Sequence, residues 1–192
     1  MGKQKITFDE VFKIWLDAEV LQIEGRDILS VAQSKGFNSI TEWRLATALR
    51  LGMDTKPWTL EKIENPNETF PKIIIGPYQG WSKFFKNELG TSFEQALEIP
   101  EFLEWCSHHD RIIPLSQKFP LPTTIILFRK PDGTLIHVEG GHRICAVAYS
   151  KKVDRPIIFP DDLPVTAAIA DISDEEIKKL IAFLERGTSK SV

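Results

Sequence analysis

The stretch TTIILFRKPDGTLIHVEGGHRICAVAY, residues 123–149, decides the fold. Two apolar, β-branched runs flank Lys130-Pro131-Asp132-Gly133, a turn sequence typical of a β-hairpin. Gly140-Gly141 ends the second strand, and the apolar, alanine-rich run after it predicts a buried helix to about Lys152. We therefore expect a hairpin that leads through a glycine turn into a helix.

The turn Glu139-Gly140-Gly141-His142-Arg143 carries the clearest chemistry of the chain. Glycines permit positive φ angles and close backbone approach, and a helix that begins there directs unpaired N–H groups and a positive dipole toward an anion. Arg143 adds a bidentate donor for a phosphate oxygen, and His142 adds a donor or a proton carrier. These residues predict a phosphate-binding turn. The alternative is a plain tight turn in which Arg143 pairs with a surface carboxylate.

Capping boxes and apolar periodicity predict further elements on both sides of this stretch. Helices are expected after Thr7, and over 27–35, 39–51, 81–89, 92–98, 100–107 and 174–186. Two short strands are expected between 54 and 80, where the run 73–75 is apolar, and further strands are expected over 155–159 and 165–170. The pattern predicts an α+β fold, in which a small mixed β-sheet is surrounded by helices. We expect an N-terminal helical subdomain over 1–54, a second domain over 55–187 and a flexible tail over 188–192.

Composition limits the classes of function. The 192 residues are 42% hydrophobic and 27% charged, which is typical of a compact globular protein. The net charge of −3 gives no global attraction to phosphate backbones and argues against nucleic acid as a partner. No apolar run reaches the roughly 20 residues of a membrane span, and no signal peptide is evident, so we expect no membrane association and a cytoplasmic location.

The two cysteines and the histidines outside the turn are weaker candidates. Cys106 and Cys145 are too few for a disulfide framework, and Cys145 is expected to be a buried, inert thiol. The spacing of Cys106, His108 and His109 matches no common zinc pattern. His137, within a predicted strand, is expected to be a surface histidine or one with satisfied hydrogen bonds rather than a base.

The glycine turn and its helix, followed by Asp154-Arg155-Pro156-Ile157, resemble the ParB/sulfiredoxin superfamily. In that superfamily a motif of glycine, two residues and arginine binds the phosphates of a nucleotide, and Gly140 and Arg143 match it. The resemblance covers about 123–170, extends back to 58 and is absent before 55. It implies a ParB/sulfiredoxin-like nucleotide-binding domain over 55–187.

The details of the turn distinguish branches of that superfamily. Sulfiredoxins carry a cysteine immediately before the His-Arg pair, where this chain has Gly141, so the resemblance does not imply sulfinic acid reduction. The free-serine kinases have an Asp-Gly-His-His-Arg box, to which Glu139, Gly140, His142 and Arg143 are similar. The free-serine kinase type is therefore the closer chemical match.

The resemblance implies an ATP-, ADP- or CTP-dependent phosphotransferase or nucleotidase that acts on a small hydroxyl-bearing acceptor, with Mg²⁺ as a candidate ion. Gly140, Gly141, His142 and Arg143 would hold phosphates, while His142 and Glu139 would be catalytic and Glu139 would also bind the metal. The alternatives are a non-catalytic nucleotide-gated regulator or a ParB-like module that binds a protein or DNA partner. For Glu139 alone, the alternative is a carboxylate that only pairs with a neighbouring basic side chain.

Overall fold

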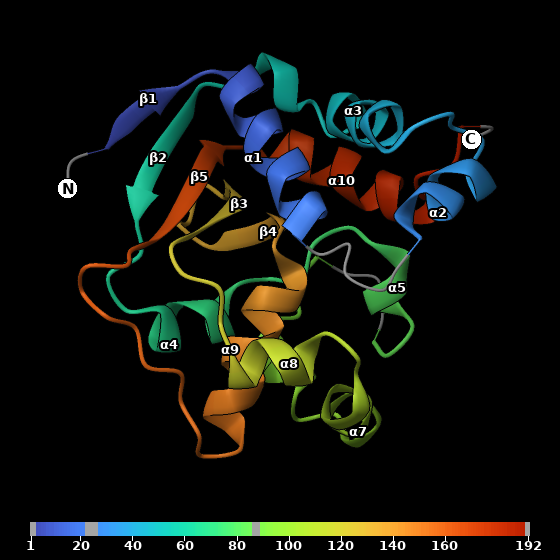
Figure 1. The fold of residues 1–192 in the computed structure, drawn as a ribbon. Coiled ribbons are helices and arrows are strands. Elements are labelled where there is room, and N and C mark those ends of the chain that lie inside the picture. Colours follow the sequence, from blue (N-terminus) through green and yellow to red (C-terminus); the bar gives the residue numbers. More distant parts are fainter. Residues whose placement is uncertain (1–2, 22–26, 86–88, 191–192) are drawn as a thin grey trace.

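The computed structural model describes residues 3–21, 27–85 and 89–190, and it shows an α+β fold with a five-stranded mixed sheet (Figure 1). The strand order is β1-β2-β5-β3-β4. β3 and β5 run parallel, and the other neighbours pair antiparallel. The strands are β1 (Gln4–Ile6), β2 (Trp58–Lys62), β3 (Thr123–Arg129), β4 (Leu135–Glu139) and β5 (Val165–Asp171). The predicted fold class and mixed sheet are confirmed.

Helices cover both faces of this sheet (Figure 1). The longer ones are α1 (Phe8–Leu21), α2 (Ile28–Ser34), α3 (Ile40–Arg50), α7 (Pro100–His108), α8 (Ile112–Gln117), α9 (Gly141–Lys152) and α10 (Asp174–Arg186). Single turns form α4 (Pro66–Thr69), α5 (Gln79–Ser82) and α6 (Phe93–Ala96), with 3₁₀ turns at Met53–Thr55 and Phe70–Lys72. In the described part of the chain, no helix combines the length and apolar character that a membrane crossing requires.

The central strands are buried on both faces, which explains their continuous apolar sequence. In β3, Ile125 and Leu127 belong to a core shared with α7, α8 and α9. The alternate residues Ile126 and Phe128 belong to a second core shared with α1 and α10. The site described below lies at the end of the sheet, between these two helical layers.

Short sequence signals identified many elements correctly. Ser39 and Ser173 accept hydrogen bonds from backbone N–H groups at the starts of α3 and α10, as the capping patterns predicted. The predicted hairpin is confirmed as β3 and β4, and α9 ends at Lys152 as expected.

Other predicted elements are wrong. The segment 155–159 forms no strand, and its Ile158 side chain is 86% exposed. The run 73–75 forms only isolated bridges, from Ile74 to Ser92 and to Ile136. The helix expected over 81–89 is reduced to α5, and residues 86–88 of that prediction lie outside the described residues. Helix α8 was not predicted.

The N-terminal segment joins the core of the sheet. β1 pairs with β2, and Val11 and Trp15 of α1 pack in the same core as Trp58 and Phe128. The boundary expected at residue 54 stays a prediction, but residues from both sides of it share this core. In the segment predicted as a tail, the Ser189 carbonyl accepts a hydrogen bond from Arg50 at 2.8 Å, while 191–192 lie outside the described residues.

Candidate functional site

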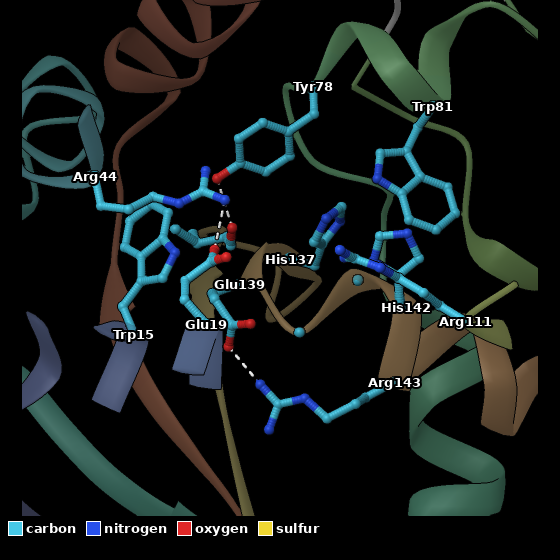
Figure 2. Close-up of a pocket in the computed structure, with 13 residues that line it drawn as sticks. Trp15, Glu19, Arg44, Tyr78, Trp81, Arg111, His137, Glu139, His142 and Arg143 are labelled. Atoms are coloured by element: carbon cyan, nitrogen blue, oxygen red, sulfur yellow. Dashed lines mark hydrogen bonds and ion pairs between the residues drawn. The ribbon is translucent and has the colours of Figure 1, made fainter. Parts of the chain in front are cut away.

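A pocket of about 140 Å³ lies where β4 ends and α9 begins (Figure 2). All five residues predicted from the glycine turn, Glu139 to Arg143, line it. The remaining lining residues come from α1, α3, the segment around α5, the start of α8 and β4: Trp15, Glu19, Arg44, Tyr78, Trp81, Arg111, His137 and Val138. The structure therefore adds residues from both helical layers to the predicted turn.

The glycine turn has the geometry that its sequence predicted. Gly140 is the N-cap of α9 and has a φ of 92°, a conformation that favours glycine. A Cβ atom at Gly140 would lie 2.6 Å from Cγ2 of Ile125, and one at Gly141 would lie 2.7 Å from Nε2 of His137. Neither position has room for a side chain, so the backbone at the start of α9 packs directly against the sheet.

A β-bulge sets the direction of Glu139. The pairing of β3 with β4 shifts at this point, since Leu127 lies opposite His137 but Ile126 lies opposite Glu139. In a regular strand, His137 and Glu139 would face the same side of the sheet. The extra residue, Val138, instead places Glu139 opposite Ile126, whose side chain belongs to the core beneath α1. Glu139 is thereby brought into the same pocket as residues of α1 and α3.

Arg143 is directed into the protein. Arg143 is 7% exposed. Its guanidinium donates to Oε2 of Glu139 at 2.5 Å and to the Thr124 carbonyl at 2.9 Å. It also donates to Oγ1 of Thr123. The arginine thus links the end of β4 to the start of β3. Its predicted pairing with a carboxylate is present, but the carboxylate is buried rather than on the surface.

The Glu139 carboxylate is buried, and Arg143 is its ion-pair partner. Burial raises the pKa of Glu139, the Arg143 charge opposes that rise, and the charge of Glu19 adds to it. The pairing with a neighbouring basic side chain agrees with the alternative interpretation of Glu139. The nearby Glu19 makes this a site with two carboxylates.

A second ion pair, between Arg44 and Glu19, was missed from the sequence. Nη2 of Arg44 lies 2.5 Å from Oε1 of Glu19, and Figure 2 shows the pair across the pocket from Trp81 and His142. Glu19 follows Trp15 by four residues, on the buried face of α1. Burying a carboxylate without a partner costs free energy. The position of Glu19 on an apolar helix face was therefore the sequence signal that could have predicted a buried basic partner.

His142 lies on an aromatic wall of the pocket. Its ring centroid is 5.2 Å from that of Trp81 and 5.1 Å from that of His109. Arg111 lies beside His142 in Figure 2. His142 is half-buried, so part of this residue is exposed to solvent.

Cys106 does not join the neighbouring histidines. Its Sγ atom lies 3.6 Å from Sγ of Cys145, and both thiols are fully buried between α7 and α9. The predicted burial of Cys145 is therefore confirmed, and burial raises the pKa of its thiol. Within residues 3–21, 27–85 and 89–190, no group of three or more His, Cys, Asp or Glu side chains could hold a metal ion.

His137 is a buried histidine with a satisfied hydrogen bond. Its Nδ1 accepts from the Gly76 N–H at 2.6 Å, which places the ring proton on Nε2 when the imidazole is neutral. Burial lowers the pKa of His137 to about 3. Of the two expectations for His137, a surface histidine is wrong and a histidine with a satisfied hydrogen bond is confirmed.

This low pKa predicts a pH-dependent stability. The unfolded chain binds a proton at His137 near pH 6.5 and the native chain does not, so stability falls as pH decreases toward 3. Between pH 7 and pH 5 the loss from this group is about 2 kcal/mol. His137→Asn keeps an acceptor near Nδ1 without a titrating group, so its unfolding free energy should change less over this interval. Urea denaturation at pH 7 and pH 5 measures the change in unfolding free energy of each protein. An equal change in the wild type and in His137→Asn would contradict the lowered pKa of His137.

The pocket is too small to enclose a whole nucleotide. Pockets that enclose a drug-sized ligand measure about 300–1,000 Å³, whereas this one measures about 140 Å³. The buried Nε atoms of Arg44 and Arg143 have no hydrogen-bond partner. Mg²⁺ is commonly held by one or two carboxylates together with phosphates, and Glu19 and Glu139 supply such carboxylates.

No protein-family model, curated protein or solved structure matches this chain in the comparisons with known proteins.

Proposed function

We propose that this pocket binds the phosphate groups of a nucleotide and transfers a phosphoryl group to a small hydroxyl-bearing acceptor. The observation that carries the proposal is the glycine turn at the start of α9, which opens into a pocket lined by Arg44, Arg111 and two buried carboxylates. N–H groups at a helix start and arginine forks are the donors that phosphate oxygens need. The sequence resemblance to the ParB/sulfiredoxin superfamily supports the same proposal.

The residues of the pocket have different roles in the proposed reaction. The backbone at Gly140 and Gly141 and the ring of His142 hold phosphate oxygens, while Arg143 fixes the position of Glu139. Glu139, with its raised pKa, accepts the proton of the acceptor hydroxyl. Bound Mg²⁺ would neutralise phosphate charge, and Glu139 would hold it. The small pocket leaves the base and ribose outside, toward the opening.

Calorimetric titration with ATP, ADP and CTP, with and without Mg²⁺, tests the binding. Turnover is measured by release of nucleoside diphosphate in the presence of small hydroxyl compounds. Glu139→Gln keeps the shape of the side chain and removes its charge, so turnover should fall by at least about tenfold while affinity changes little. Failure of every nucleotide to bind would contradict the proposed function.

Glu61→Gln is the matched control for this substitution. Glu61 also pairs with an arginine, Arg129, at 2.7 Å, but it does not line the pocket. Turnover in this control should equal that of the wild type. Turnover that is unchanged in Glu139→Gln would remove the role given to that carboxylate.

The regulator remains a second candidate because the pocket joins two helical layers. Trp15, Glu19 and Arg44 come from the layer of α1 and α3, whereas His142 and Arg143 come from α9. A ligand that contacts both layers alters their packing, which is the basis of a nucleotide-gated switch. Nucleotide binding without any turnover in the experiment above would favour this candidate.

A further inference from the structure

We infer that Arg44 is the arginine that recognises the phosphate, and that Glu19 occupies its guanidinium until the ligand displaces it. The inference rests on the proposed function, because it names the recognition residue of the same pocket. It differs from the sequence-based expectation, which gave this role to Arg143.

The contacts of Arg143 leave little of its guanidinium for a ligand. Both terminal nitrogens donate to protein oxygens: Nη2 to Glu139, and Nη1 to Thr123 and Thr124. Turning Arg143 toward a phosphate would break these bonds and leave the Glu139 charge buried without its partner. Such an unpaired buried charge is strongly destabilising, so Arg143 stays in place and positions Glu139.

The contacts of Arg44 are fewer and can be exchanged. Its ion pair is with Glu19, and its guanidinium lies 3.8 Å from the centroid of the Trp43 ring, a face that holds the group flat. Nε of Arg44 is buried and has no hydrogen-bond partner. In Figure 2 its guanidinium lies beside Tyr78, across the pocket from His142. A planar, oriented donor with unused capacity fits a phosphate oxygen pair.

The charges of the pocket favour the exchange. Three arginines, Arg44, Arg111 and Arg143, line this pocket together with two carboxylates, Glu19 and Glu139, so the lining has an excess of positive charge. A phosphate carries more negative charge than a carboxylate and forms a stronger pair with Arg44. Displacement of Glu19 toward solvent therefore replaces a weaker partner of Arg44 with a stronger one, and it increases the excess of positive charge that the phosphate meets.

The test measures the affinity for inorganic phosphate and for ATP by calorimetry in two single variants. Arg44→Gln removes the recognising charge, so affinity should fall by about tenfold to a hundredfold. Glu19→Gln removes the competing carboxylate, so affinity should rise, by about fivefold or more, on the scale of a charged hydrogen bond. A fall in affinity for Glu19→Gln would overturn the inference, because it would make the ion pair a structural support of the site.

Matched controls lie on the same two helices. Asp17→Asn removes a carboxylate of α1 that pairs with Lys13 on the exposed face, and Arg50→Gln removes a charge of α3 that contacts Ser189. Neither residue lines the pocket. Both controls should bind phosphate as the wild type does. Equal effects of the controls and the pocket variants would show that only the overall charge of the helices matters and would overturn the inference.

Each single variant leaves one buried charge without its partner and could unfold for that reason. The double variant Glu19→Gln/Arg44→Gln controls for this effect, because it removes both charges of the pair. Circular dichroism and the melting temperature establish that it is folded. Its affinity for phosphate should be at least about tenfold below that of Glu19→Gln alone. If the wild type binds no phosphate and no nucleotide, the proposed function fails as well. If the wild type binds and the double variant binds equally well, only the role of Arg44 fails.

Discussion

Replacing Gly76 with alanine should lower the free energy of unfolding by about 3 kcal/mol, at the upper end for overpacking of a core. A Cβ atom at Gly76 would lie 1.9 Å from the backbone oxygen of His137, and this contact cannot be relieved by turning a side chain. The backbones are held together there, since the Gly76 N–H donates to Nδ1 of His137 at 2.6 Å and the His137 N–H donates to the Ile74 carbonyl at 3.0 Å. The substitution therefore separates this segment from β4.

Gly80→Ala is the matched control, because a Cβ atom at Gly80 meets nothing within 4 Å. Gly80 lies in α5, where alanine is the better helix former, so this variant should be as stable as the wild type or slightly more stable. Urea denaturation monitored by tryptophan fluorescence compares the three proteins. Equal stability of the two variants would contradict the close contact between Gly76 and β4.

Removing Arg143 should have the second large effect. In Arg143→Ala the Glu139 carboxylate remains buried without its partner, and the expected loss of stability is about 3–5 kcal/mol. The bonds from Arg143 to Thr123 and Thr124, which join β3 to the start of α9, are lost as well. The sequence alone suggested a loss of nucleotide affinity instead, since it placed Arg143 on the ligand.

A double variant separates the charge effect from the loss of packing. Glu139→Gln/Arg143→Gln removes both charges and keeps polar side chains of similar size, so it should be more stable than Arg143→Ala. Arg155→Ala, which changes an exposed arginine, should leave stability within about 0.5 kcal/mol of the wild type. A loss below about 1 kcal/mol for Arg143→Ala would contradict the buried ion pair.

The fold could be predicted where local chemistry decides the structure. Serine caps at 39 and 173 and the Pro-Asp-Gly turn at 131–133 act within a few residues, and the elements that they begin were found. The segment 155–159 has a strand-like composition, but it pairs with none of the five strands of the sheet. Strand pairing is a tertiary property that β propensity does not encode.

Only the part of the candidate site that is formed by consecutive residues could be predicted from the sequence. The turn from Glu139 to Arg143 forms part of one pocket, as its spacing suggested. The partner carboxylate Glu19 and the arginine Arg44 lie far away along the chain, in helices that were interpreted as a separate subdomain. The β-bulge at Val138, which directs Glu139 toward them, depends on the register between strands and has no evident local signal.

The position of β5 has a consequence for the order of folding during synthesis. This strand comes after the other four in the chain, yet it lies at the centre of the sheet, between β2 and β3. Until residues 165–171 leave the ribosome, β2 and β3 each present an open edge that can pair with another nascent chain. The sheet of a growing chain therefore cannot close before β5 is made, and until then its open strand edges favour aggregation.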